Sequence, residues 1–249
     1  RHAMSASTLR IGVLMPEVLG TYGDSGNALI LAERARRRGI DAEVVCVGLT
    51  EEIPDSLDIY TLGGGEDTAQ ALAADKFRGT SGLSRALDAG RPLLAICASL
   101  QVLGHWYEDA RGTRVPGMGV LDITTRPQGH RAIGELVCEP LVDGLTQTLT
   151  GFENHGGGTV LGPDASPLGR VVAGVGNGVP QGQEAPELRH DGAVQGSVIA
   201  TYMHGPALAR NPELADLLLE RATGATLEPL EVPGVAQLRA QRLAAIAAT

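Results

Sequence analysis

The sequence predicts an α/β protein in which a mostly parallel sheet, flanked by helices, is followed by a β-rich second half. As far as residue 107, short apolar runs alternate with helical patterns, which is typical of βαβ units. Beyond residue 119, short β segments separated by glycine and proline replace this alternation. Hydrophobic residues make up 43% of the 249-residue chain and aromatic residues only 3%, so a large core must be built from aliphatic side chains.

The first unit of the sheet lies near the N-terminus. An apolar strand is expected at 9–15, and a loop rich in glycine and small polar residues follows it at 16–27. A helix at 28–38 is expected to end at Gly39, because glycine commonly terminates helices. A second strand at 42–47 completes a βαβ unit.

The same alternation continues to residue 107. The expected elements are a strand at 57–62, helices at 68–75 and 81–89, a strand at 92–96 and a helix at 100–107. In a parallel sheet with helices on both faces, ligands bind at the carboxyl ends of the strands. The loop around Asp24, the glycines 63–65 and Cys97 all fall at those ends.

The second half is expected to add antiparallel extensions to the sheet. Short β segments are expected at 119–123, 133–138, 149–152, 159–161 and 170–175. A surface loop at 176–192 precedes a β-hairpin or pair of strands at 193–202. Asn211 and Pro212 are typical of a helix start, and that helix is expected to reach about residue 223. A last helix is expected at 235–247.

Charge and length argue against several classes of function. The net charge of −9 and the lack of a basic run other than 34–38 give little support to nucleic-acid binding. The longest apolar stretch, 92–106, is shorter than the roughly 20 residues of a membrane-spanning helix. Residues 1–4 resemble a cloning remnant, and no signal peptide follows them.

The three cysteines, Cys46, Cys97 and Cys138, are an odd number at wide spacing. This pattern argues against a disulfide framework and a zinc site, and it favours a reducing cytoplasm. Cys46 is expected to be a buried structural residue of the second strand.

Cys97 differs, because an apolar strand ends on it and a helical pattern begins directly after it. Near a helix N-terminus a thiolate is favoured, and backbone N–H groups face whatever the thiol attacks. The alternative is a buried core cysteine, and this stretch alone leaves both interpretations open.

A cysteine nucleophile needs a base that takes its proton and returns it to the leaving group. Among the six histidines, His204 ends a strand and precedes a Gly-Pro pair, whereas His155 follows another strand. The pattern favours His204 and leaves His155 as the second candidate. The alternative for His204 is a loop hydrogen bond without a chemical role.

Four motifs carry a family resemblance: Tyr22-Gly-Asp-Ser-Gly-Asn27, Gly63-Gly-Gly-Glu-Asp67, Gly151-Phe-Glu-Asn-His155 and Thr201-Tyr-Met-His-Gly-Pro206. With the Cys97 turn they resemble class I glutamine amidotransferases of the cobyric-acid-synthase-like branch, and more narrowly the glutaminase subunits of lipid II isoglutaminyl synthases. We therefore expect an amidotransferase domain at 9–224, after a tag remnant and N-terminal tail at 1–8 and before a C-terminal helical tail at 225–249.

The resemblance implies a glutaminase reaction through a cysteine thioester. Cys97 would attack the side-chain amide of L-glutamine. Backbone N–H groups of Ala98 and of Gly64 or Gly65 would hold the oxyanion. His204 would protonate the departing ammonia and then activate the water that releases glutamate.

Gln101 and Arg131 are the candidates for holding the glutamine substrate, because an arginine suits an α-carboxylate. A solvated surface arginine is the alternative for Arg131. The chain departs from the usual amidotransferase elbow, where glycines flank the cysteine at two residues on either side. Here these positions hold Ala95 and Ser99, whose side chains leave less space for the sharp turn at Cys97 than glycines would.

The third member of the site is also unusual. Most of the class places an acid two residues after the histidine, and Pro206 stands there in this chain. The resemblance implies that Asp24 can serve instead. A helix cap is the equally weighted alternative for Asp24.

The sequence has no P-loop, so neither ATP nor another cofactor is expected on this chain. The resemblance implies a heterodimer with a Mur-ligase-like partner that carries ATP and Mg²⁺. That partner would amidate the D-glutamate α-carboxyl of lipid II in peptidoglycan synthesis, at the inner face of the membrane and without insertion of this chain. The alternatives are an ammonia supply for another carboxylate ligase, such as a corrinoid amidase, a cysteine peptidase-like hydrolase, or a non-catalytic binding protein on the same fold.

Overall fold

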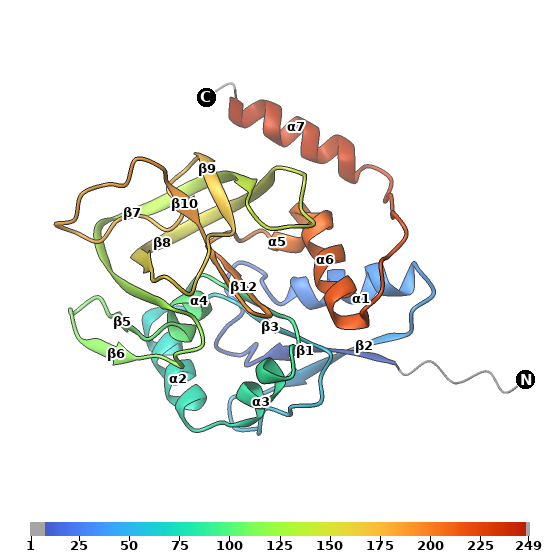
Figure 1. The fold of residues 1–249 in the computed structure, drawn as a ribbon, viewed down its shortest axis with the longest axis horizontal. Helices are drawn as coiled ribbons and strands as arrows, with labels where there is room; N and C mark the ends of the chain where they lie inside the picture. Colours follow the sequence, from blue (N-terminus) through green and yellow to red (C-terminus); the bar gives the residue numbers. More distant parts are fainter. Residues whose placement is uncertain (1–7, 248–249) are drawn as a thin grey trace, which may run out of the picture.

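The chain forms two sheets, the first of which is the predicted mostly parallel sheet (Figure 1). The computed structural model describes residues 8–247, so the predicted tag remnant and all but the last residue of the predicted N-terminal tail lie outside the described residues. In spatial order the first sheet contains β11 (Ala193–Gln195), β12 (Val198–Thr201), β4 (Leu93–Ile96), β3 (Ile59–Leu62), β1 (Leu9–Leu14) and β2 (Ala42–Val47). Neighbouring strands are parallel except β11 and β12, which form the predicted antiparallel pair.

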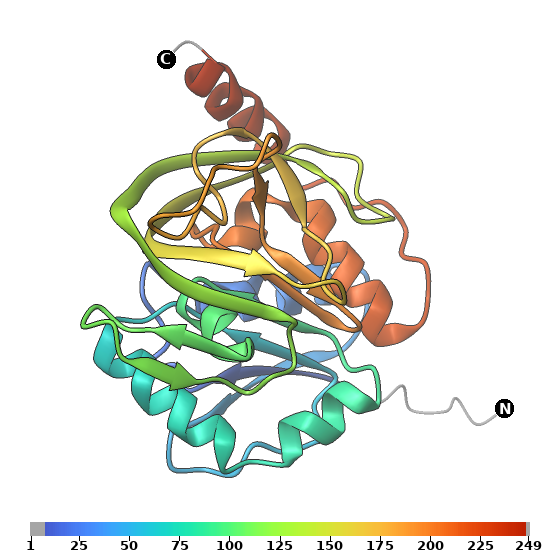
Figure 2. The same cartoon turned by 60° about the vertical axis from the view of Figure 1, so that its left-hand side comes forward.

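Helices cover both faces of this sheet, as the βαβ alternation predicts. They are α1 (Gly26–Arg36), α2 (Asp67–Arg78), α3 (Gly82–Asp88), α4 (Ala98–Leu103), α5 (Ala207–Arg210) and α6 (Pro212–Thr223). Figures 1 and 2 show α1 and α6 on one face and α2 and α3 on the other. Since βα loops of such a sheet meet at one edge, the loops before α1, α2 and α4 surround a common space.

The second sheet corrects the expectation that the β-rich half only extends the first sheet. It contains β5 (Trp106–Glu108), β6 (Arg114–Pro116), β7 (Ile123–Pro140), β8 (Leu149–Leu161), β9 (Gly169–Ala173) and β10 (His190–Asp191). Its order is β10-β9-β7-β5-β6, and β8 pairs with β7 (Figure 2). The segments expected at 133–138, 149–152 and 159–161 therefore belong to two long antiparallel strands, because the glycines that we interpreted as breaks lie within the pairing or at a bulge in it.

Three smaller expectations are also wrong. The helix predicted at 100–107 ends at Leu103, because Gly104 has an extended backbone and the next residues pair as β5. Cys46 is exposed, because β2 is an edge strand of the first sheet. The loop predicted at 176–192 contains the short strand β10 and a buried residue, Asn177, whose side chain hydrogen-bonds the backbone of Gly192.

The last helix, α7 (Val235–Ala247), has the predicted bounds and buries none of its residues. No helix within residues 8–247 is both long and apolar enough to span a bilayer.

Candidate active site

Cys97 occupies a sharp turn between β4 and α4. Its backbone has φ 54° and ψ −105°, a conformation that residues with a side chain rarely adopt. The backbone N–H of Cys97 donates to the Thr201 carbonyl at 2.9 Å, which ties the turn to β12. The turn therefore has the strand–elbow–helix geometry that the sequence predicts for a nucleophile.

The two residues that replace glycine around the elbow are accommodated in different ways. Ala95 is fully buried in β4. Ser99 is fully buried as well, and its hydroxyl donates to the Gly63 carbonyl. Because a glycine could not make this bond, Ser99 links helix α4 to the glycine loop that follows β3.

His204 and Asp24 form a buried pair beside the elbow. His204 Nδ1 lies 2.9 and 3.1 Å from the two carboxylate oxygens of Asp24. An ionised carboxylate only accepts hydrogen bonds, so Nδ1 carries a proton, and in a neutral imidazole Nε2 then holds the lone pair. The buried Nε2 has no hydrogen-bond partner within residues 8–247. This nitrogen is therefore available to accept a proton.

The side chains of Cys97, His204 and Asp24 converge on Gly64. A Cβ built on Gly64 would lie 2.7 Å from His204 Cε1, 3.3 Å from Asp24 Oδ2 and 3.5 Å from Cys97 Cβ. Pro206 stands where most of the class has an acid, and the carboxylate that contacts the histidine comes from Asp24 in the loop after β1.

Asp24 does not cap helix α1 in this structure. The N-cap position is Ser25, and no side-chain cap bond is formed there. The Asp24 carboxylate instead accepts the Gly64 backbone N–H at 2.8 Å as well as the His204 ring. Asp24 thus connects the first loop, the glycine loop and the histidine.

The same bond corrects the expected choice of oxyanion donors. The Gly64 N–H is already donated to Asp24, which removes Gly64 as a candidate donor. Gly65 and Ala98 both line the cavity in front of Cys97. The remaining candidate pair is therefore the backbone N–H of Ala98 and that of Gly65.

Burial determines the protonation of the nucleophile. Burial and, to a smaller extent, the nearby Asp24 carboxylate raise the pKa of Cys97 to about 12, although the Ala98 N–H and Arg131 lower it. The expectation that the helix N-terminus favours a thiolate is wrong for this state, because the desolvation of the thiolate outweighs what a six-residue helix offers. Cys97 is thus a thiol at neutral pH, and it needs a base that removes its proton during attack.

His155, the second candidate base, is engaged at both ring nitrogens. Its Nδ1 lies 2.9 Å from the Gly157 carbonyl and its Nε2 lies 3.4 Å from Glu153 Oε2. The ring stacks on Tyr202 with 3.7 Å between centroids. The geometry therefore favours His204 over His155 as the base.

Asp191 lies buried behind this cluster. Its carboxylate accepts hydrogen bonds from the Thr201 hydroxyl and the Tyr202 backbone N–H. Burial raises the pKa of Asp191 to about 6, although these two hydrogen bonds lower it. Asp191 is thus a buried acid that titrates near the physiological range.

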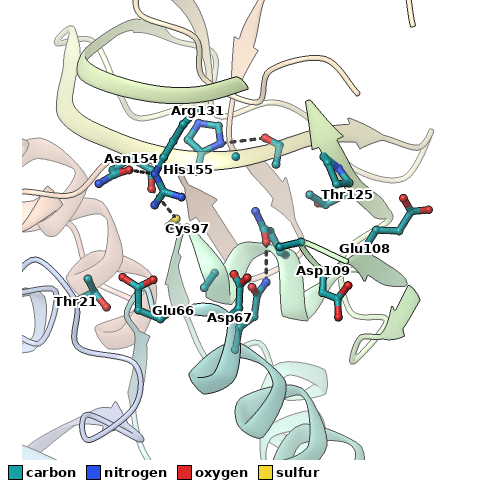
Figure 3. Close-up of a pocket in the computed structure, with 18 of the residues that line it drawn as sticks. Thr21, Glu66, Asp67, Cys97, Glu108, Asp109, Thr125, Arg131, Asn154 and His155 are labelled. Atoms are coloured by element: carbon teal, nitrogen blue, oxygen red, sulfur yellow. Dashed lines mark hydrogen bonds between the residues drawn. The ribbon is translucent and has the colours of Figure 1, made fainter. Parts of the chain in front are cut away.

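A cavity of about 400 Å³ opens in front of the elbow (Figure 3). Cys97, Ala98 and His204 all line it. Arg131 and Asn154 lie on one side of the cavity, and their side chains are joined by a hydrogen bond. Four acidic residues line the other side: Glu66, Asp67, Glu108 and Asp109. An amino acid, which carries an ammonium and a carboxylate, matches a cavity with opposite charges on its two sides.

The two predicted substrate-binding side chains both line this cavity. Arg131 is exposed and belongs to a bulge of β7 between Pro127 and Ala132. Gln101 is buried, and its carboxamide accepts from Gln70 Nε2 at 2.6 Å and donates to Tyr202 Oη at 3.0 Å. Gln101 therefore lines the cavity, and both the oxygen and the nitrogen of its carboxamide are hydrogen-bonded to other side chains.

Sequence reasoning missed several residues of the cavity. Glu108 and Asp109 were not recognised, because residues up to 107 were assigned to a helix that instead turns into β5. Tyr22 and Asn154 stand within the motifs, but the sequence does not show which residue either side chain contacts. Their hydrogen bond to each other joins residues that are far apart in the chain.

Comparison with known proteins agrees with this geometry. The family of CobB/CobQ-like glutamine amidotransferase domains matches residues 10–212. The chain is 37% identical over 240 residues to the subunit GatD of lipid II isoglutaminyl synthase (glutamine-hydrolyzing) from Staphylococcus aureus (strain N315), which covers 94% of each chain. The subunit of the same name from Streptococcus pneumoniae (strain ATCC BAA-255 / R6) is 33% identical over 240 residues, or 95% of this chain and 89% of the relative.

A solved structure shares the fold. The crystal structure of a glutamine amidotransferase superposes with a TM-score of 0.55 at 21% sequence identity, over 86% of this chain and 98% of that chain. The sequence matches confirm the resemblance that the four motifs predict. The chain therefore belongs to the CobB/CobQ-like glutamine amidotransferase family and, within it, to the family of GatD subunits of lipid II isoglutaminyl synthase.

Proposed function

We propose that this chain hydrolyses L-glutamine at Cys97 and supplies the ammonia to a ligase partner that amidates lipid II. One observation carries the glutaminase part of this proposal. A buried histidine, oriented by Asp24, leaves its Nε2 without a partner among the described residues, beside a strained cysteine at the cavity. This arrangement provides a nucleophile and a base in one site.

In the first half of the reaction, Cys97 Sγ attacks the side-chain carbonyl carbon of glutamine while its proton passes to His204 Nε2. The carbonyl oxygen becomes an oxyanion, which the N–H groups of Ala98 and Gly65 stabilise. The C–N bond then breaks as His204 returns the proton to the leaving nitrogen. Ammonia departs and a glutamyl thioester on Cys97 remains.

In the second half, His204 Nε2 takes a proton from water, and the resulting hydroxide attacks the thioester. The C–S bond breaks, Cys97 recovers a proton from His204, and glutamate leaves. Asp24 accepts the hydrogen bond of the Nδ1 proton and stabilises the imidazolium that forms twice in the cycle. The chain needs no cofactor for either half-reaction.

The partner in this proposal is a Mur-ligase-like subunit that binds ATP and Mg²⁺. It would activate the D-glutamate α-carboxyl of the lipid II stem peptide and accept the ammonia, which yields D-isoglutamine. The names of the two GatD relatives support lipid II as the substrate of the complex and glutamine as the nitrogen source. The partner subunit would make the contact with lipid II at the inner face of the membrane.

The test is amidation of lipid II by this chain together with a candidate Mur-ligase-like subunit, ATP and Mg²⁺. We expect glutamine to support conversion of the carboxylate to the carboxamide, measured by mass spectrometry. The Cys97→Ala complex should fail with glutamine and should still amidate with ammonium chloride. Amidation by Cys97→Ala with glutamine, or no amidation by the wild-type complex with either nitrogen source, would reject the proposal.

A further inference from the structure

Asn154 makes two side-chain hydrogen bonds at the cavity that the reaction scheme does not use, and Figure 3 shows the one to Arg131. Its Oδ1 accepts from Arg131 Nε at 2.6 Å, and its Nδ2 donates to Tyr22 Oη. Its backbone carbonyl lies 3.9 Å from Cys97 Sγ. The residue is therefore in contact with a predicted substrate-binding side chain, with the loop after β1 and with the nucleophile.

The fold fixes Asn154 more firmly than it fixes Arg131. Asn154 pairs with Ile133 in the long β7–β8 ribbon, and Phe152 on the same strand pairs with His204 across the two sheets. Arg131 lies on the bulge of β7 and is exposed. An exposed arginine loses much rotamer entropy when it is held in one position, so a fixed partner matters for its orientation.

The bond to Asn154 also sets which edge of Arg131 faces a ligand. Because Asn154 binds Nε, the edge formed by the two terminal nitrogens remains for a carboxylate, in a bidentate geometry. Acidic residues such as Glu66 and Asp67 line the same cavity and attract the guanidinium. The hydrogen bond to Asn154 holds Arg131 on the opposite side of the cavity from these acids.

Tyr22 supports the other end of this connection. Its backbone has φ 58°, and its ring packs edge-on against His204 with 4.9 Å between centroids and 61° between planes. Tyr22 therefore connects the side chain of Asn154 with His204, the proposed base.

We propose that Asn154 is a positioning residue for glutamine: it holds Arg131 so that the guanidinium receives the α-carboxylate. This inference rests on the proposed glutaminase function. It predicts an effect on substrate binding and little effect on the chemical step, because neither Cys97 nor His204 bonds to the Asn154 side chain in the residues that the structure describes.

The test measures kcat and KM for glutamine hydrolysis, with the partner subunit present. We expect Asn154→Ala to raise KM about tenfold and to leave kcat within about threefold of wild type. Tyr22→Phe keeps the ring against His204 and loses only the hydroxyl, so its KM should rise less. Gln183→Ala removes an exposed carboxamide that does not line the cavity in front of Cys97, and it should match wild type. Circular dichroism and thermal melting establish that each variant is folded.

A double-mutant comparison separates positioning from direct contact. If Asn154 acts through Arg131, Asn154→Ala should raise KM no further in an Arg131→Ala background. Multiplicative KM effects would overturn the inference, as would a lower kcat with unchanged KM in folded Asn154→Ala. If Asn154→Ala does not fold, an unchanged KM in Tyr22→Phe would overturn the inference. A raised KM in Tyr22→Phe that multiplies fully with the effect of Arg131→Ala would overturn it as well. A wild-type complex that never hydrolyses glutamine would reject the proposed function as well, whereas an active wild type with unchanged variants rejects only the role of Asn154.

Discussion

Two histidines lie near Cys97, and their hydrogen bonds distinguish their roles. His204 is held at Nδ1 by Asp24, whereas His155 is engaged at both nitrogens by Gly157 and Glu153. A general base contributes about 10²- to 10⁴-fold to a rate. We expect His204→Ala to lower kcat/KM for glutamine hydrolysis by about 10³-fold, measured as glutamate release. His155→Ala, which removes only a packed and paired ring, should retain activity within about tenfold.

Thermal melting of both histidine variants provides the control for folding. If folded His155→Ala were inactive while His204→Ala retained its rate, the two assignments would have to be exchanged.

The buried acid Asp191 makes stability depend on pH. Its pKa is about 6 in the folded chain, above the ordinary value of 3.8, so the protonated form is favoured by folding. Its contribution to stability is therefore fully present below pH 3.8 and is lost as the pH rises through 6. Asp191→Asn does not titrate. The free energy of unfolding of wild type, relative to this variant, should thus fall by on the order of 3 kcal/mol between about pH 4 and 7, because one pKa unit corresponds to about 1.4 kcal/mol.

Urea unfolding at several pH values measures this difference. Parallel stability curves for wild type and Asp191→Asn would show that folding does not raise the pKa of Asp191.

The sequence identified the residues of the site better than their electrostatics. Cys97, His204 and Asp24 could be predicted because each directly follows a strand or stands in a loop at the carboxyl ends of strands. The raised pKa of Cys97 could not, since it depends on burial by residues that are distant in the chain. The same holds for the bond between Gly64 and Asp24, which changes the pair of candidate oxyanion donors.

At the scale of elements, the glycine loop after β3 sets the distance between the elbow and the histidine. A side chain at Gly64 would collide with His204 Cε1, at 2.7 Å from the new Cβ. The backbone of Gly64 is not in the left-handed region, so alanine brings a steric conflict without backbone strain. We expect Gly64→Ala to lower kcat/KM by at least about 10²-fold through displacement of His204, measured as glutamate release.

Gly79→Ala is the matched control, because a Cβ there meets only the Lys76 carbonyl at 3.6 Å. It should match wild type in rate. Full activity of a folded Gly64→Ala variant would contradict the close approach of the loop to His204.

The sequence also predicted most elements of the first sheet and few of the second. The strands and helices up to residue 96 follow from local hydrophobic periodicity, and α7 has its predicted bounds. The β7–β8 ribbon depends on pairing between segments that are distant in sequence, and its glycines at 129, 134 and 156–158 gave the local signal of turns. The bulge that presents Arg131 is a property of that pairing, so no local pattern could predict it.

At the scale of the whole molecule, α7 lies at the periphery of the fold and buries none of its residues (Figure 1). Arg239 donates to the carbonyls of Thr148 and Arg210, and Arg242 pairs with Glu135. A chain that ends at residue 232 loses these contacts and the bond from Arg239 to Asn211 Oδ1, and none of the residues of α7 is buried. We expect it to keep glutaminase activity within about twofold and its melting temperature within a few degrees.

A chain that ends at residue 224, the predicted domain boundary, is the informative comparison. It also loses Leu227, which packs on the core, and the Leu230 carbonyl, to which Arg34 donates at 3.3 Å. It should therefore melt at a lower temperature than the chain that ends at 232. Equal melting temperatures would support the boundary at 224, and inactivity of the longer truncation would mean that α7 contributes to the site.

Labelling with a glutamine-analogue diazoketone tests the central claim, that Cys97 is the nucleophile toward glutamine, most directly. Peptide mass spectrometry of the chain with its candidate partner should show one adduct, on Cys97, which glutamine protects and which His204→Ala slows. Iodoacetamide, which does not resemble glutamine, should instead prefer the exposed Cys46, because Cys97 is a buried thiol with a raised pKa. An unmodified Cys97 after diazoketone treatment, or an adduct on Cys46 or Cys138 alone, would contradict the account.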